Sequence, residues 1–416
     1  MGARVARTAA VAVVCLSLGG CWLVPGQGPD RRAHNPFESG LTAANVPTLE
    51  QAWSTDTGEG RVNAPVVSGG GVHVSAGLEV VTLDPATGAE RWTYTAPTIE
   101  GPGTTSEVFV RGDEVLLGYG YGNLGGNWHA VALDIADGTA RELPFGGLLD
   151  SVRDAMVARR TFSFGSGTPV VQSLGLANVD TGEGWFGVAT VSDSGQGATP
   201  PVTVATSGLW QAGQGLMNTT PVAEPHFGNA VRFYTTARPP NCAPGTFPQY
   251  IPCPQSVAPI DGAATSPVIG PSLVYVGTNA GTMYAVDQAD GSVAWSTEVP
   301  GPVTAPPAAT DDRLFVVTTS GELVVLDAAT GEALWGAGGL GTLAVQPAVA
   351  GGVVYVAGND GVVRAFDAAG CGAASCSPLW QADTGDSAIT GDPAVSNGRL
   401  LVGTQDGRVV AFAPGG

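Results

Sequence analysis

Residues 266–295 read SPVIGPSLVYVGTNAGTMYAVDQADGSVAW, and this stretch holds the unit from which the chain is built. A short apolar run at Leu273–Val276 leads through a Gly-containing turn at residues 279–281 into a second apolar run, which ends at Asp287. Another Gly-containing turn then precedes Trp295. Short apolar runs separated by Gly and Asn or Asp predict β-strands joined by tight hairpins.

The same phrase recurs along the chain. Two more clear copies run from Pro307 to Trp335 and from Pro347 to Trp380. Shorter traces of the turn and its Trp, or of the turn alone, occur earlier, at Asp84 to Trp92, Asp134 to Gly138 and Asn178 to Phe186. A repeat of about forty residues with four short apolar runs is typical of a β-propeller blade, because a four-stranded sheet can bury both faces only between neighbours.

We therefore predict an all-β protein, a β-propeller of eight four-stranded blades. Seven blades is the alternative, because the third and fourth copies are weakly marked. The outer strands are expected to end near Trp53, Trp92, Leu143, Phe186, Phe233, Trp295, Trp335 and Trp380.

The last copy is incomplete at its carboxyl end. It runs from Pro393 to Ala413 and stops where its Asp and Trp should follow. Near the amino terminus, residues 52–58 read AWSTDTG and match residues 379–385, LWQADTG. We expect this amino-terminal segment to supply the outer strand of the last blade and close the ring, which removes exposed sheet edges.

These features resemble the pyrroloquinoline-quinone (PQQ) type of propeller repeat and its tryptophan-docking motif, roughly Ala-x-Asp-x-x-x-Gly-x-x-x-Trp. The resemblance covers most of Gln51 to Ala413. It implies that the outer-strand tryptophans pack between adjacent blades as structural residues. The tryptophans concerned are Trp53, Trp92, Trp295, Trp335 and Trp380.

The amino terminus has the pattern of an export signal. Arg4 and Arg7 precede an apolar stretch over Thr8–Leu18, which is too short to span a bilayer as a mature helix. The following sequence, Leu18 to Cys21, resembles the lipobox of bacterial lipoproteins, in which the Cys is lipidated. An ordinary cleaved signal peptide is the alternative.

We expect a lipoprotein signal peptide over residues 1–20, a flexible tether over residues 21–45 and a single propeller domain over residues 46–416. The tether is inferred from its Pro, Gly and Arg content and its lack of a strand pattern. The protein is then exported and lipid-anchored to the outer face of the bacterial cytoplasmic membrane, or on the periplasmic side where an outer membrane exists. The membrane is reached through the lipid alone.

Composition narrows the classes of partner. The 17 basic residues are all Arg, and the formal net charge is -19. Nucleic-acid binding depends on basic clusters that neutralise phosphates, and this chain lacks them, so we expect no nucleic-acid partner. Gly 62 and Pro 31 indicate a turn-rich chain, whereas 44% hydrophobic residues argue against disorder.

The remaining cysteines come as two close pairs, Cys242 with Cys253 and Cys371 with Cys376. In an exported protein such pairs predict local disulfides that hold loops. Metal binding is the alternative, but no Cys-x-x-Cys or nearby His completes a ligand set, so no metal site is expected.

Two insertions break the repeat and mark a candidate binding face, because function on repeat scaffolds tends to lie in such loops. The first, Gly118 to Trp128, contributes Tyr119, Tyr121 and Trp128; the second, Arg238 to Pro259, is expected in the link to blade five. The same kinds of loop carry Asp56, Glu59, Asp360, Asp383, Asp386 and Asp406. These residues predict a docking face for a cationic or hydrogen-bonding partner, or else a solvated acidic rim.

Two functions follow from the resemblance. The first is a non-catalytic binding scaffold at the cell envelope, monomeric, similar in plan to the lipoprotein BamB, with a protein or small-ligand partner and no cofactor. The second is a reduced PQQ-dependent oxidoreductase. Related dehydrogenases hold PQQ in a central funnel against a disulfide of adjacent cysteines, with calcium and a catalytic Asp, and adjacent cysteines do not occur here. No catalytic residue is therefore assigned.

Overall fold

In the computed structural model of this chain, the apolar runs of the repeat form short antiparallel strands. The structure describes residues 22, 25–58, 60–97, 104–120, 128–165, 168–192, 202–204, 208–216, 227–242, 252–385 and 387–415. In the clearest repeat, β21 (Leu273–Gly277) and β22 (Thr282–Asp287) are almost wholly buried, whereas β23 (Val293–Glu298) alternates between exposed and half-buried residues. Inner strands are covered on both faces by neighbouring sheets, and the outermost strand meets solvent.

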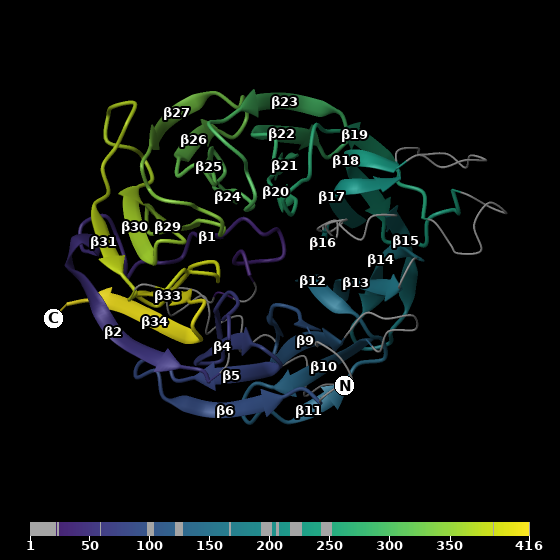
Figure 1. Cartoon of the computed structure of the whole chain (residues 1–416), viewed down its shortest axis with the longest axis horizontal. Coiled ribbons are helices and arrows are strands. Elements are labelled where there is room, and N and C mark those ends of the chain that lie inside the picture. The colour runs from purple at the N-terminus through teal and green to yellow at the C-terminus, as the bar shows by residue number, and fades with distance from the viewer. Residues whose placement is uncertain are drawn as a thin grey trace.

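The described strands form eight sheets, arranged radially as the blades of a closed ring (Figure 1). Blade one contains β3 (Val66–Ser68), β4 (Gly71–Ala76), β5 (Glu79–Leu83) and β6 (Glu90–Thr95). Blade two contains β7 (Thr104–Thr105), β8 (Phe109–Arg111), β9 (Glu114–Gly120), β10 (Trp128–Asp134) and β11 (Ala140–Glu142). Blade three contains β12 (Leu148–Arg153), β13 (Met156–Gly165), β14 (Thr168–Asn178) and β15 (Gly184–Ser192). Blade four contains β16 (Val202–Val204), β17 (Gly208–Leu216), β18 (Phe227–Thr235) and β19 (Ser256–Pro259).

The later blades follow the same plan. Blade five contains β20 (Val268–Ile269) and β21 to β23. Blade six contains β24 (Ala308–Ala309), β25 (Arg313–Val317), β26 (Leu323–Asp327) and β27 (Ala333–Ala337). Blade seven contains β28 (Ala348–Ala350), β29 (Val353–Ala357), β30 (Val362–Asp367) and β31 (Trp380–Asp383), and blade eight contains β32 (Ala394–Ser396), β33 (Arg399–Gly403), β34 (Arg408–Pro414) and β2 (Leu49–Asp56). The prediction of an all-β propeller with eight blades is confirmed.

Blade eight is closed by the amino-terminal strand, as predicted. Strand β2 pairs antiparallel with β34, from Leu49 opposite Pro414 to Asp56 opposite Arg408. The outer strand of the last blade therefore comes from the other end of the described chain. This pairing covers what would otherwise be an exposed sheet edge.

Blade four departs from the sequence prediction. Phe233 lies in β18, the third strand, and the outer strand is β19. The segment from Arg238 to Pro259 therefore lies within blade four: it leads from β18 to β19, and its last four residues are β19 itself. The prediction was wrong here because this blade has no Asp-to-Trp spacing to mark its outer strand, so an aromatic residue of the third strand was assigned in its place.

The outer-strand tryptophans lie between blades. The indole N–H of Trp53 donates to the carbonyl of Pro85 in the next blade at 3.1 Å, and Trp92 and Trp295 donate to carbonyls at the equivalent turn of their neighbours. The turn glycine of the next blade lies directly against the indole ring, since a Cβ on Gly88 would be only 2.6 Å from Trp53 Cε3. The Asp-x-x-x-Gly turn and the Trp thus form one contact between neighbouring blades.

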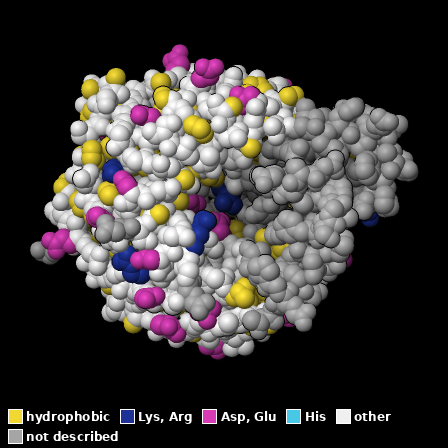
Figure 2. Space-filling model, in the orientation of Figure 1, with side chains coloured by type: hydrophobic (Ala, Val, Ile, Leu, Met, Phe, Trp, Pro, Cys, Tyr) yellow, Lys and Arg dark blue, Asp and Glu magenta, His cyan; other side chains and the backbone are white. Residues whose placement is uncertain are grey.

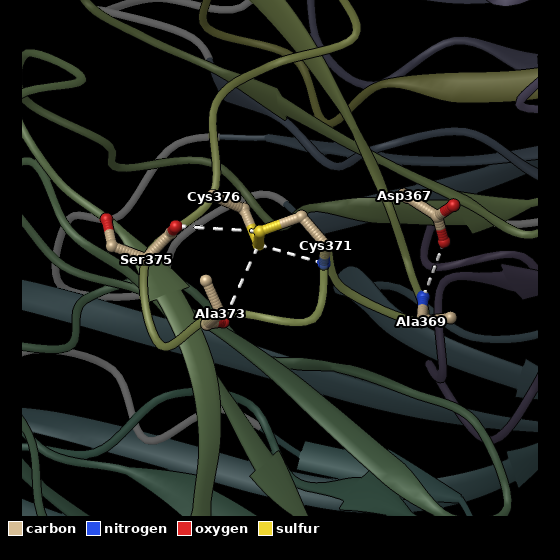
Figure 3. The surroundings of a disulfide bond; sticks show 6 residues. All are labelled: Asp367, Ala369, Cys371, Ala373, Ser375 and Cys376. Atoms are coloured by element: carbon tan, nitrogen blue, oxygen red, sulfur yellow. Dashed lines mark hydrogen bonds between the residues drawn. A yellow bond between two sulfur atoms is a disulfide. The ribbon is translucent and has the colours of Figure 1, made fainter.

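Both predicted disulfides are present. Cys242 bonds to Cys253 within the blade-four insertion, and Cys371 bonds to Cys376 between β30 and β31. In Figure 3 the second disulfide closes a short loop that follows Asp367, whose carboxylate accepts the backbone N–H of Ala369 at 2.8 Å. This loop replaces the compact turn found at the same place in blade six.

The two ends of the ring differ in the connections that they carry. One end, which we call the linker face, carries the turns between second and third strands and the links from blade to blade. The other end, which we call the Asp-turn face, carries the turns between first and second strands and the Asp-containing turns before the outer strands. In blade five, Ala280 lies on the linker face and Ala289 on the Asp-turn face.

The chain's own amino-terminal segment lies inside the channel along the ring axis (Figure 1). We call Trp22 together with residues 25–35 the plug. The backbone carbonyls of Asp30, Arg32 and Ala33 accept the N–H groups of Ile269, Ala309 and Val349, at 2.9, 2.8 and 2.7 Å. These donors belong to the inner strands of blades five, six and seven, and β1 (His34–Asn35) adds a parallel strand to β28.

The flexible tether predicted over residues 21–45 does not describe this segment. Trp22 is 1% exposed, and Ala33, Leu41 and Asn35 are also buried. The plug continues into a strap, residues 36–48, which includes a short 3-10 helix (Val46–Thr48) and leads into β2. Inner strands have free N–H and C=O groups toward the axis, and an irregular chain can satisfy them without any periodic sequence. Within the described ranges, no helix is long and apolar enough to cross a membrane.

Candidate functional site

Four carboxylates of the predicted binding face lie together on the linker face of blades seven and eight. Asp56 and Asp383 end the outer strands β2 and β31, and Asp360 and Asp406 lie in turns between second and third strands. All four residues are exposed. Glu59, Asp386 and Tyr121, which were predicted on the same face, lie outside the described residues.

These carboxylates are individually stabilised rather than bare. Asp360 pairs with Arg364 at 2.6 Å, and Asp406 pairs with Arg408 at 2.9 Å. Burial by itself would raise the pKa of Asp360, but hydrogen bonds from Arg364 and from the Val362 N–H hold it below its usual value. Figure 2 accordingly shows acidic side chains dispersed, several of them beside basic ones, and no continuous acidic sheet on the face in view.

Asp56 and Asp383, like Asp360, cap turns. Each accepts a backbone N–H two residues later, from Gly58 at 2.8 Å and from Gly385 at 2.7 Å. One oxygen of each carboxylate is thus fixed by the turn in an exposed position. Such carboxylates can receive a cationic group from a partner without rearrangement of the backbone.

The aromatic residues of the first insertion are placed differently from the prediction. Strand pairing between β9 and β10 extends to Gly120 opposite Trp128, so residues 118–120 and 128 belong to strands. Tyr119 is 1% exposed and its ring stacks on His129 with centroids 5.2 Å apart. Tyr119 is therefore a core residue and not a loop-tip anchor, whereas Trp128 is half-buried at the start of β10.

A polar cluster that the sequence did not reveal lies at the mouth of the channel on the linker face. Gln346 donates its backbone N–H to Asp392 Oδ1 at 2.8 Å and its side-chain amide to the carbonyl of Arg31 at 2.8 Å. The Arg31 guanidinium lies 3.6 Å from Glu107 and donates to the carbonyl of Asp150 at 2.6 Å. Glu107, Gln346 and Asp392 each precede an inner strand, which brings links of three blades around the plug.

The electrostatics of this cluster favour the protonated form of Asp392. Burial, followed by the negative charge of Glu107, raises the pKa of Asp392 to about 7, and the Gln346 N–H and the charges of Arg31 and Arg61 offset only part of that effect. Asp392 is therefore partly protonated at neutral pH. A cation that entered the mouth would favour the ionised carboxylate.

A second concavity lies on the Asp-turn face. It has a volume of about 410 Å³ and is lined by residues of the plug, the strap and blades six and seven. Its polar lining includes His34, Asp312, Arg313 and Asp367. Arg313 already donates to the carbonyl of Ala368 at 2.9 Å, so its charge is partly committed to the wall.

Sequence reasoning missed Arg31, His34, Glu107, Gln346 and Asp392 because none of them lies in a motif. The available signal was positional: Glu107, Gln346 and Asp392 precede apolar inner strands, where links approach the axis. Among the described residues, no group of three or more His, Cys, Asp or Glu side chains is arranged to hold a metal ion.

A protein-family model described as outer membrane protein assembly factor BamB matches residues 38–143 and 253–412, more than half of the chain. The chain belongs to this family. The match omits blade three and the first three strands of blade four, where the repeat is degraded. A comparison with curated proteins found no match.

Solved structures agree on the fold of this BamB-family propeller. BamB from Moraxella catarrhalis is 16% identical, with a TM-score of 0.57 over 88% of this chain and 99% of that one. A quinohemoprotein alcohol dehydrogenase from Comamonas testosteroni is also 16% identical, with a TM-score of 0.65 over 99% of this chain and 84% of that one. The computationally designed protein Ika8 gives a TM-score of 0.59 at 16% identity, over 88% of this chain and 99% of that one. At this identity the likeness shows the fold alone.

The quinone implied by part of this fold family does not fit the described residues. The axis of the ring is taken by Asp30–Asn35, which are hydrogen-bonded to inner strands. The two disulfides join cysteines 11 and 5 residues apart, so neither has the adjacent pair of the dehydrogenases.

Proposed function

We propose that this protein is a non-catalytic, lipid-anchored binding propeller at the cell envelope, and that it engages a partner protein through its linker face. The observation that carries the proposal is the amino-terminal segment bound inside the channel. The segment that occupies the channel is bonded to inner strands of blades five, six and seven and reaches Asp150 in blade three. With the axis committed to the fold, recognition is left to the ends of the ring.

The linker face has the chemistry for a cationic partner surface. Asp56 and Asp383 present fixed, exposed carboxylates, and the channel mouth adds Glu107 and Asp392 nearer the axis. The insertion held by the disulfide between Cys242 and Cys253 joins the third strand of blade four to its outer strand, so it opens on the Asp-turn face and not, as predicted, beside the first insertion. Charge complementarity between the linker-face carboxylates and a cationic surface raises the rate of association and selects among partners.

Matched double variants test the face. D56N/D383N on the linker face and D137N/D290N on the Asp-turn face each remove two negative charges. All four side chains accept an N–H two residues later, a bond that Asn preserves. We expect chemical crosslinking on native membranes to recover several-fold less of one specific partner with D56N/D383N and an unchanged amount with D137N/D290N. Equal recovery with both variants would refute the assignment of the face.

The alternative is a reduced PQQ-dependent oxidoreductase, because the quinohemoprotein alcohol dehydrogenase shares this fold. Addition of PQQ and Ca²⁺ to the purified protein distinguishes the two functions. A binding scaffold leaves the absorbance of the quinone and the melting temperature of the protein unchanged. A stoichiometric change in the quinone spectrum together with dye-linked alcohol oxidation would overturn the non-catalytic proposal.

Lipidation is part of the proposal and rests on the sequence at Leu18–Cys21. Cys21→Ala removes the thiol to which the lipid would be attached and should release the protein from membranes. The measurement is incorporation of radiolabelled palmitate together with fractionation. Unchanged incorporation in the variant would show that the anchor lies elsewhere.

A further inference from the structure

The plug enters the channel from the Asp-turn face. Trp22 exchanges both backbone hydrogen bonds with Val67, at 3.0 and 2.7 Å, and the pair is antiparallel. Strand β3 runs from the linker face, where residue 63 bonds to Ser75, toward the turn at Gly69 on the Asp-turn face. The chain at Trp22 therefore runs from the Asp-turn face toward the linker face.

The plug then turns inside the channel and returns. The N–H of Ala33 donates to the carbonyl of Gly26, and β1 runs parallel to β28, which leads toward the Asp-turn face. Beyond β1, Glu38 accepts the N–H of Gly398 at 3.2 Å in a turn of that face. The plug is thus a hairpin inserted into the ring from one end, and both of its arms open on the Asp-turn face.

This path determines where the lipid anchor would lie. Cys21 is bonded to Trp22, and consecutive Cα atoms are about 3.8 Å apart. We propose that the plug orients the propeller on the bilayer, with the Asp-turn face toward the membrane and the linker face toward the partner. The inference rests on the proposed lipidation of Cys21 and deepens the proposed function, because it places anchor and binding face at opposite ends.

The exposed apolar side chains support this orientation. The large hydrophobic residues that are exposed in the described part of the chain are Phe37, Val293, Leu334 and Leu379. Phe37 lies in the strap, and the other three lie at the beginnings of outer strands, which start at the Asp-turn face. Single exposed apolar residues are ordinary, but here they all lie at the end where the plug opens.

The negative charge of the Asp-turn face opposes its adsorption to anionic lipid, so the effect of the plug can be tested separately. The Asp-turn face carries Asp84, Asp287, Asp327 and Asp367, which anionic headgroups repel. Attraction to charged lipid cannot then produce this orientation. The covalent path through the plug sets it, and the orientation should persist in neutral phosphatidylcholine vesicles and at high salt.

The experiment uses two exposed alanines of one blade. Ala280→Cys on the linker face and Ala289→Cys on the Asp-turn face lie at opposite ends of β22, about 20 Å apart. Each full-length lipidated variant is labelled with a fluorophore and bound to phosphatidylcholine vesicles that contain a headgroup-nitroxide lipid. We expect several-fold stronger quenching at position 289 than at position 280, unchanged by salt.

A control lengthens the anchor. About 20 Gly and Ser residues inserted between Cys21 and Trp22 span about 25 Å as a flexible coil, so the difference in quenching should be lost. Bound protein with equal or reversed quenching in the uninserted chain overturns the orientation alone. Protein that stays in the supernatant, with no quenching at either position, overturns the lipid anchor and with it the orientation.

Discussion

Gly88→Ala should weaken the contact between blade one and the amino-terminal strand that closes the ring in blade eight. Gly88 has φ +72° and packs on Trp53, the tryptophan of the amino-terminal strand β2. A left-handed conformation costs an L-residue about 1 kcal/mol. The new Cβ would also lie 2.5 Å from Thr55 Oγ1 and 2.6 Å from Trp53 Cε3, far inside the usual contact distance. Displacing these groups costs about 1–3 kcal/mol.

Gly112→Ala is the matched control. Gly112 has φ +64°, but a Cβ there would meet no heavy atom within 4 Å. The two variants therefore share the backbone penalty and differ only in the contact with β2. We expect Gly88→Ala to lose about 2 kcal/mol more of the free energy of unfolding than Gly112→Ala.

The assay is urea denaturation followed by tryptophan fluorescence, with amide hydrogen exchange to locate the effect. Exchange should accelerate in Leu49–Asp56 in Gly88→Ala and stay unchanged in Gly112→Ala. Equal losses of stability in the two variants would refute the argument. They would show that the Trp53 contact contributes nothing to closing the ring.

Three further predictions follow from buried groups. The folded-state pKa of Asp392 is raised from 3.8 to about 7, so this carboxyl binds its proton more tightly in the folded state and the protein loses stability as pH rises between those values. Asp392→Asn should therefore be more stable than the wild type at pH 8 but not at pH 3.5. An equal difference in stability at both pH values would contradict this. His73 is buried, and burial is the main reason that its pKa is lowered from 6.5 to about 4, so the wild type should lose stability as pH falls from 6.5 to 4. His73→Gln should reduce this fall in melting temperature with pH. An unchanged dependence of melting temperature on pH would exclude His73 as its source. Tyr119→Ala should cost about 3–5 kcal/mol because a buried ring is removed from the core; a variant with normal urea unfolding would return Tyr119 to the binding face.

The sequence by itself was sufficient for the architecture. The Asp-to-Trp spacing marks blades one, five and six, and the match of residues 52–58 to 379–385 marks where the ring closes. These features can be recognised in the sequence because each blade has the same local requirements. A tight turn needs Gly, and the indole of the neighbouring blade needs a flat surface to pack on. The paired cysteines were readable for a similar reason, since a disulfide between near neighbours depends mainly on local geometry.

Blade four and Tyr119 show where local pattern stops being sufficient. Phe233 was assigned to an outer strand because aromatic residues are common there, but pairing with β17 places it in the third strand. Tyr119 looked like part of a Gly-rich loop, yet pairing of Gly120 with Trp128 extends the strands past it. Only the partner strand decides where a strand ends.

The plug and the channel mouth were decided by the tertiary structure alone. The plug is bonded through the carbonyls of Asp30, Arg32 and Ala33, which any residue type could supply, so selection leaves no periodic or compositional mark on the sequence. Likewise, Asp392 acquires its raised pKa from burial and from Glu107, 285 positions away in the chain. The repeat fixes how each blade is built, because that depends on neighbours in sequence; what fills the axis depends on edges that exist only once the ring has closed.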